Sequence, residues 1–258
     1  MHRLSKLTKW LTLGFATLSA AGSTCLAAPV PVLLELFTSE GCSSCPPADQ
    51  LLATLDEKQP EPGAELIVLS EHVDYFNSSA WKDPFSARLF TERQEAFSRR
   101  PGFDGVYTPQ MVVDGRFGFV GSDNAAASAA IRKALRQTKI PLAISGVARK
   151  RTSVSVRIDS VGDRDLKVAQ GRVFIALAEE RVESRVSGGE NARRTLRHVA
   201  VVRELKSAAT IDTHGPSTAE TRFELQPEWG AKGMRVVAFI QDPATGYVLG
   251  VAERKLIP

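Results

Sequence analysis

The sequence has few cysteines, few aromatic residues and, beyond its first thirty residues, no long hydrophobic run. Only 3 of its 258 residues are cysteine, and 7% are aromatic. No later run approaches the roughly 18 apolar residues that a membrane-spanning helix requires. We find no phosphate-binding loop, nucleotide-binding glycine fingerprint, internal repeat or Ser-His-Asp order above chance. These absences exclude a small scaffold held together by many disulfides, and they give no sign of nucleotide chemistry.

The first 28 residues have the organisation of a secretory signal peptide. Arg3, Lys6 and Lys9 form a basic start, and an uncharged apolar stretch follows from Trp10 to Ala21. Cys25-Leu26-Ala27 then offers the small residues of a cleavage site. Lipidation of Cys25 and an uncleaved anchor are the alternatives. We expect cleavage, no stable membrane span afterwards, and a periplasmic or secreted protein.

Removing this leader changes the reading of the charge. The full chain has 33 basic and 29 acidic residues. The leader holds three of the basic residues and none of the acidic ones, so 30 basic residues remain and the net charge falls to +1. The basic balance of the full chain therefore gives no argument for a nucleic-acid partner, and we expect none.

The most informative motif is Cys42-Ser43-Ser44-Cys45. It follows an apolar run, and Pro46 and Pro47 directly after it suit the first turn of a helix. A cysteine at a helix N-terminus is favoured as the nucleophilic thiolate. We interpret Cys42 as the attacking thiol and Cys45 as the resolving thiol. The alternative is a structural disulfide, although closing so short a loop removes little entropy from the unfolded chain.

Residues 30–139 have the pattern of alternating strands and helices. Short apolar runs predict strands, and leucine or phenylalanine at helical spacing predicts helices. Asp114-Gly115 between two apolar runs predicts a two-residue hairpin turn. The expected order is β-α-β-α-β-β-α, from segments that begin at or near Val32, Pro46, Leu66, Asp83, Met111, Phe117 and Asp123.

This order, with a Cys-x-x-Cys at the start of the first helix, resembles the minimal thioredoxin fold. Thr108-Pro109 directly precedes the hairpin, where the thioredoxin superfamily has a cis-proline beside the two cysteines. The resemblance implies that Thr108 and Pro109 shape a groove for an extended peptide. Ser43-Ser44 differs from the dipeptides of familiar oxidoreductases, so reductase, oxidase and isomerase roles stay open.

Several longer segments resemble an uncharacterised family of exported bacterial proteins with a domain of unknown function. The likeness covers nearly all of the mature chain. It implies a thioredoxin-like domain and redox chemistry, and it names no substrate. It is carried by Glu35–Asp49, His72–Tyr75, Trp81–Phe85, Tyr107–Gly115, Thr195–His198 and Val201–Leu205.

From about Pro141 the pattern changes to short runs that alternate with period two, and no helical pattern is evident. Roughly seven short strands in about 115 residues suggest an antiparallel β-sandwich. The sequence thus predicts a signal peptide (1–28), a thioredoxin-like α/β domain (29–139) and a β-sandwich-like domain (140–258).

Four further residues are candidates for supporting the cysteines. Glu35 lies in an apolar strand and could accept the proton of Cys45, or it could simply be paired in a salt bridge. His72 and Asp74 follow the second strand, at the end where α/β sheets commonly hold sites. His198 lies in the second half and could fold over the cysteines.

These features predict an exported thiol–disulfide oxidoreductase that acts on protein thiols or disulfides without a bound cofactor. Two other functions stay open. Cys42, Cys45 and a histidine could bind or deliver copper or zinc, since thiolates select such ions. The chain could also be a binding module whose disulfide is inert.

Overall fold

The computed structural model describes residues 28–229 and 233–256, so the expected signal peptide lies outside the described residues except for Ala28. The order of elements over residues 30–134 is the expected β-α-β-α-β-β-α. No helix in the described chain is long and apolar enough to cross a membrane. The elements are β1 (Val30–Thr38), α1 (Pro46–Lys58), β2 (Ala64–His72), α2 (Arg88–Ser98), β3 (Gln110–Val113), β4 (Phe117–Val120), α3 (Asn124–Ala134), β5 (Leu142–Lys150), β6 (Ser153–Ser160), β7 (Gln170–Arg185), β8 (Thr195–Asp212), β9 (Ser217–Glu224), β10 (Met234–Gln241) and β11 (Val248–Leu256).

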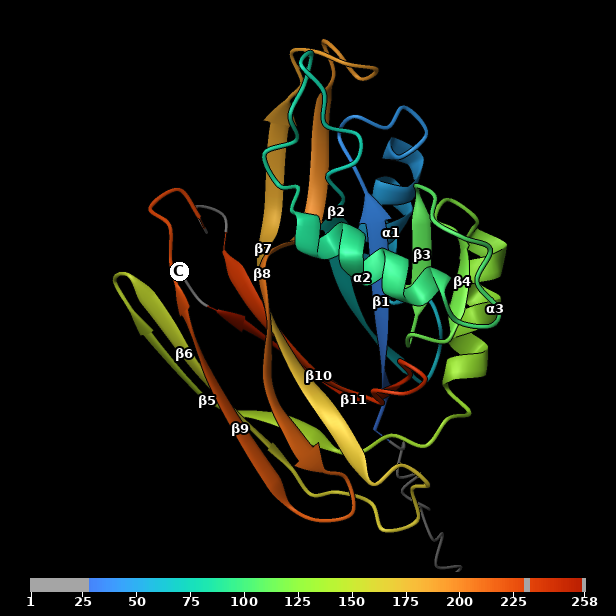
Figure 1. Cartoon of the computed structure of the whole chain (residues 1–258), viewed down its shortest axis with the longest axis vertical. Coiled ribbons are helices and arrows are strands. Elements are labelled where there is room, and N and C mark those ends of the chain that lie inside the picture. The colour runs from blue at the N-terminus through green and yellow to red at the C-terminus, as the bar shows by residue number, and fades with distance from the viewer. Residues whose placement is uncertain (1–27, 230–232, 257–258) are drawn as a thin grey trace, which may run out of the picture.

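The predicted fold class, a thioredoxin-like α/β domain followed by an antiparallel β-sandwich, is wrong. Eight strands from both halves form one mixed sheet in the order β11-β10-β7-β8-β2-β1-β3-β4 (Figure 1). The halves join where β8 runs parallel to the outer edge of β2, with Ser70 opposite Val201. The remaining strands form a three-stranded sheet, β5-β6-β9. The chain is therefore mostly β, and its sheet continues across the expected boundary.

The physical reason is that β7 and β10 are buried on both faces. Val236, Ala238 and Ile240 pack in a cluster with the three-stranded sheet. Val237 and Phe239 pack in another cluster with residues of β1, β2 and α2. A free-standing sandwich would leave one of these faces in water, whereas here the first half of the chain covers it.

The helices lie on both faces of the β1–β3 region and so fix where the cysteines lie. Leu34 and Leu36 of β1 pack with α1 and α3. Leu33 packs on the opposite face in the cluster that includes Phe90 of α2. Because α1 follows β1 after a short loop, residues 39–45 are held at the carboxyl end of β1.

Arg235 on β10 holds α1 against the far part of the sheet. Its side chain is buried and donates hydrogen bonds of 2.6–3.0 Å to Asp56 of α1, Glu180 of β7 and Glu253 of β11. Burial acts to lower the pKa of Arg235, but the three carboxylates raise it well above its ordinary value. The guanidinium is therefore charged and fully partnered.

We expect Arg235→Met to lower the free energy of unfolding by about 3–5 kcal/mol, because it leaves three partly buried carboxylates without their cation. Urea unfolding measures this. Arg222→Met is the matched control, since Arg222 pairs with Glu224 on an exposed part of β9 and such pairs contribute about 0–1 kcal/mol. Equal losses in the two variants would contradict the role of Arg235.

Candidate functional site

The two cysteines form a disulfide in the loop between β1 and α1. Their Cα atoms are 5.4 Å apart. Cys42 is 2% exposed and Cys45 is fully buried, whereas Ser43 and Ser44 between them are exposed. The Oγ of Ser44 lies 3.4 Å from the Sγ of Cys42. The peptide between the sulfurs thus faces solvent while the sulfurs lie beneath it.

The start of α1 differs from the simple picture of a cysteine at the helix tip. Cys45 is the N-cap residue, and Cys42 lies three residues before it. Pro46 and Pro47 have no N–H, and the next two amides, of Ala48 and Asp49, donate to the carbonyl of Cys45. The helix start therefore offers a thiolate fewer free N–H groups than a helix without these prolines.

The tip of the β7–β8 hairpin, residues 186–194, closes over the cysteine loop. Asn191 is fully buried, and its Nδ2 donates to the carbonyls of Glu40 and Cys42, both at 2.9 Å. Glu190 accepts from the amide of Ser43 at 2.9 Å. Figure 1 shows this tip at the same end of the molecule as the loops after β1 and β2. We call residues 186–194 the clasp.

A glycine fixes how closely the clasp approaches the loop after β2. A Cβ on Gly188 would lie 1.8 Å from the carbonyl oxygen of Ala80. No other residue type fits there without moving one of the two backbones. The clasp therefore packs against both the cysteine loop and the loop after β2.

His198 lies beneath the cysteine loop and joins its two flanks. Its Nε2 lies 3.5 Å from Glu40, just before the cysteines, and its Nδ1 lies 3.5 Å from Asp49 in the first turn of α1. Burial acts to lower the pKa of His198, but Asp49 and Glu40 outweigh it and raise the pKa to about 10. His198 is thus an imidazolium at neutral pH, with two buried carboxylates around it.

His72 belongs to the same cluster. Its ring lies edge-on to the ring of His198, with centroids 4.7 Å apart, and its Nδ1 lies 2.8 Å from Asp83. Burial acts to raise the pKa of Asp83, but His72 and backbone amides, including that of Glu40, lower it to about 2. The structure therefore places His72 and His198 together behind the cysteines.

The remaining predicted residues, namely the Thr108–Pro109 pair, Asp74 and Glu35, lie in three different places. The Thr108–Pro109 peptide is cis, as expected. A Cβ on Gly121 would lie 3.2 Å from both Pro109 and Ala48, so Pro109 borders the first turn of α1. Asp74 accepts a hydrogen bond from Thr91 of α2.

Glu35 lies on the face of the sheet opposite α1. Its Oε1 accepts from Nε of Arg93 on α2 at 2.5 Å, and Arg93 also lies 3.6 Å from Glu71 of β2. Burial and the neighbouring Glu35 raise the pKa of Glu71 well above its ordinary value, against the lowering effect of Arg93. Glu35 is thus paired in a salt bridge, which was the alternative to its accepting the proton of Cys45.

A groove runs beside the first turn of α1. It has a volume of about 460 Å³ and lies between α1 and the parts of β7 and β8 that extend past β2. Asp49 and His198 line it together with Pro46, directly after Cys45. The groove therefore leads from solvent to the charged cluster under the cysteine loop. Within residues 28–229 and 233–256, no group of three or more His, Cys, Asp or Glu side chains is arranged to hold a metal ion.

The sequence reasoning missed Glu40, Asp49, Asp83, Glu190 and Asn191. Glu40 and Asp49 flank the Cys-x-x-Cys, and their proximity to it was the available signal. Asn191 follows Cys42 by 149 residues, and nothing in its surroundings marks it.

The model of a family described as a protein of unknown function (DUF1223) matches residues 33–241. A crystal structure of a protein from Agrobacterium tumefaciens, solved by a structural genomics consortium, is similar over 88% of this chain and 95% of that one, with 26% identity and a TM-score of 0.64. HBP35 of Porphyromonas gingivalis is similar over 89% of this chain and 76% of that one, with 14% identity and a TM-score of 0.64. The second likeness concerns the fold alone. No curated protein matches the chain.

We expect the stabilising effect of His198 to be lost at alkaline pH. Its pKa is about 10 in the folded protein against an ordinary value of 6.5, so the effect is complete below the lower value and disappears as pH rises through the higher one. The difference in unfolding free energy between the wild type and His198→Gln should shrink by several kcal/mol across this range. Urea unfolding at a series of pH values measures it. A difference that stays constant would mean that His198 is neutral throughout.

We expect Asn191→Ala to speed reduction of the Cys42–Cys45 disulfide by dithiothreitol about tenfold or more, because two hydrogen bonds of about 1 kcal/mol each no longer hold the clasp. Thiol trapping followed by mass measurement gives the rate. Asn124→Ala, on the exposed start of α3, is the control and should react like the wild type. Equal rates in all three proteins would show that the clasp does not limit access.

Proposed function

Since the chain belongs to the family described as a protein of unknown function (DUF1223), whose description assigns no activity, we propose a function from the site itself: thiol–disulfide exchange through Cys42 and Cys45 by an exported enzyme. The basic and apolar leader pattern supports a periplasmic or secreted location. An oxidised cysteine pair fits such a compartment. Protein thiols or disulfides are the proposed partners, and the groove beside α1 supplies room for one.

The observation that carries the proposal is the setting of the disulfide. Cys45 caps a helix, Cys42 precedes it in an irregular loop, and a protonated, buried histidine joins both flanks of that loop. A disulfide that only stabilises the fold needs no such cluster, and strongly shifted pKa values gather at functional sites.

The exchange follows from the position of each sulfur. A substrate thiolate attacks the Sγ of Cys42, the sulfur nearer the solvent, and the S–S bond breaks with Cys45 leaving as thiolate at the N-terminus of α1. A second substrate thiolate then attacks the mixed disulfide and releases Cys42. The substrate leaves as a disulfide, and the two electrons and two protons that it lost reside on the two cysteine thiols. The reverse sequence reduces a substrate disulfide.

The charges around the loop favour a low reduction potential for the Cys42–Cys45 pair. Two carboxylates, Glu40 and Asp49, surround one imidazolium, which leaves a net negative charge beside the loop. Like charge disfavours a thiolate, and Pro46 and Pro47 supply no N–H to offset it. Strong oxidants in this class owe their high potential to a stabilised thiolate. We therefore infer that this pair acts mainly as a reductant.

Burial of both cysteines favours a second candidate, a binding module whose disulfide is inert. Cys42 is 2% exposed and Cys45 is fully buried, and the clasp covers the loop between them. In that case the charged cluster would only fix the clasp in place.

The reduction potential of the pair distinguishes the two candidates. For an exchange catalyst with a poorly stabilised thiolate, we expect a value near −270 mV, far from the value of about −120 mV of a strong oxidant. Equilibration in dithiothreitol buffers with thiol trapping measures it, and Cys42→Ser should abolish the mixed disulfide with a model dithiol. A pair that resists reduction well below about −300 mV would instead identify the inert module.

A further inference from the structure

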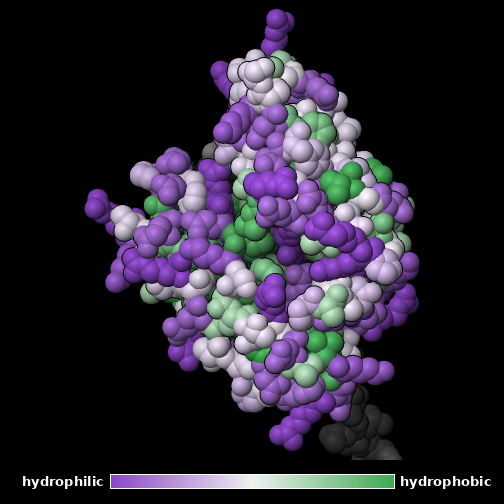
Figure 2. All heavy atoms as spheres, in the orientation of Figure 1, coloured by the Kyte–Doolittle hydropathy of each residue, from purple (hydrophilic) through white to green (hydrophobic). Residues whose placement is uncertain are grey.

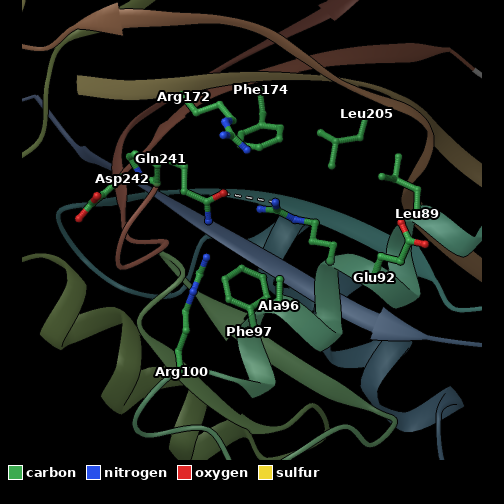
Figure 3. Close-up of a pocket in the computed structure, with 12 residues that line it drawn as sticks. Leu89, Glu92, Ala96, Phe97, Arg100, Arg172, Phe174, Leu205, Gln241 and Asp242 are labelled. Atoms are coloured by element: carbon green, nitrogen blue, oxygen red, sulfur yellow. Dashed lines mark hydrogen bonds between the residues drawn. The ribbon is translucent and has the colours of Figure 1, made fainter.

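A second pocket lies between α2 and the strands β7, β8 and β10, on the face of the sheet opposite α1. Its volume is about 250 Å³, and none of its lining residues belongs to the cysteine loop or to the groove beside α1. The space-filling view is hollowed beside α2, with hydrophobic residues inside and hydrophilic ones around the rim (Figure 2). The lining residues are drawn in Figure 3.

Two buried guanidinium nitrogens at this pocket have no hydrogen-bond acceptor. The side chain of Arg93 is 9% exposed, and its Nη2 is unpartnered although its Nε binds Glu35. The Nη1 of Arg100 is also buried without an acceptor, and it packs against Gly246. Unsatisfied buried donors are rare in folded proteins, and they call for a partner.

A third arginine completes the group. Arg172 on β7 is exposed at the rim, and its guanidinium has no ion pair within the described part of the chain. In Figure 3 the guanidinium of Arg100 points toward the amide of Gln241, and the guanidinium of Arg172 lies beside the ring of Phe174. Arg93, Arg100 and Arg172 all line this pocket, so an anion bound there would meet three positive charges.

The charged side chains at this pocket have a net charge of +1. Glu35 balances Arg93, and Glu92 pairs with Arg88. Arg100 and Arg172 then carry two positive charges against the single negative charge of Asp242, which also lines the pocket and whose carboxylate accepts from the amide of Ala244. A single negative charge would therefore neutralise the site.

The remaining wall is apolar and partly aromatic. Phe97 and Phe174 flank the guanidinium of Arg93, which lies 5.2 and 5.3 Å from their ring centres. Leu89 and Leu205 line the outer part. The pocket is smaller than the roughly 300–1,000 Å³ of sites for drug-sized ligands, so its ligand is small.

We propose that this pocket binds a small monocarboxylate with an aromatic or branched aliphatic body. The carboxylate accepts charge-assisted hydrogen bonds from the unpartnered Nη2 of Arg93 and from Arg172, and the charge of Arg100 adds to the attraction. The body lies against Phe174, Leu89 and Leu205. A phosphate ion fits less well, because its second charge has no counterpart and it has no group for the apolar wall. The pocket is independent of the thiol chemistry proposed above.

Calorimetric titration of the whole protein with benzoate near neutral pH tests the proposal. We expect saturable binding with a dissociation constant around 1 mM or lower, which is about −4 kcal/mol or tighter. Benzamide has the same shape without the charge and should bind at least roughly tenfold more weakly. Inorganic phosphate should also bind more weakly than benzoate.

The variants locate the site. Arg172→Gln should weaken benzoate binding by about tenfold to a hundredfold. Arg172 is exposed, so the variant is expected to fold. Arg185→Gln, at the exposed end of the same strand, removes the same charge outside the pocket and should bind benzoate like the wild type. Benzamide binding as tightly as benzoate, phosphate binding more tightly, no saturable benzoate binding, or the same affinity in both variants would each overturn the proposal.

Discussion

The edge of β2 that faces away from β1 has to pair with another strand. The arrangement of most of the molecule depends on which strand pairs there. An unpaired strand edge carries free N–H and C=O groups that tend to pair with any available strand. Here β8 supplies the pairing, at Ser70 and Val201, and the first residues of β8 pair with the last residues of β7 up to the clasp. This one junction joins the two halves into a single sheet and carries His198 and the clasp to the cysteine loop. Arg235 reinforces it by tying α1 to β7 and β11.

The buried charges around Arg235 and around His198 differ in how closely they are partnered. Arg235 is surrounded by three carboxylates and every charge there has a close partner, as stability demands. His198 instead has carboxylates at 3.5 Å on either side and no close hydrogen bond, and Arg93 and Arg100 keep unpartnered nitrogens. Incomplete partnering at a solvent-connected groove or pocket is costly unless another group completes it. The same criterion thus leads to both proposed sites.

The sequence predicts local features well because they depend on neighbouring residues. The cysteine pair, the cis bond before Pro109 and the helix capped by Asp123 are all present. The hairpin is present too, but three residues, Asp114 to Arg116, separate the paired Val113 and Phe117 where two were expected. The arrangement of the sheet was predicted wrongly. An apolar strand pattern indicates that a strand is buried, but it does not identify which other strands or helices cover it. Val236–Ile240 is apolar at every position, which indicates a strand buried on both faces; an outer strand of a two-layer sandwich would alternate. Asn191 had no such signal, since its partner is 149 residues away.

Under the proposed exchange, burial of the sulfurs would slow the reaction without preventing it. The clasp is held to the loop by two hydrogen bonds from Asn191 and one to Glu190. At about 0.5–1.5 kcal/mol each, these bonds leave the loop open for roughly a tenth to a thousandth of the time. A free thiol would therefore react slowly with the pair. Under the same proposal, a partner that replaced Asn191 at the carbonyls of Glu40 and Cys42 would gain access to the sulfurs and supply the lost hydrogen bonds. The clasp would then select partners by their backbone as well as by their thiols.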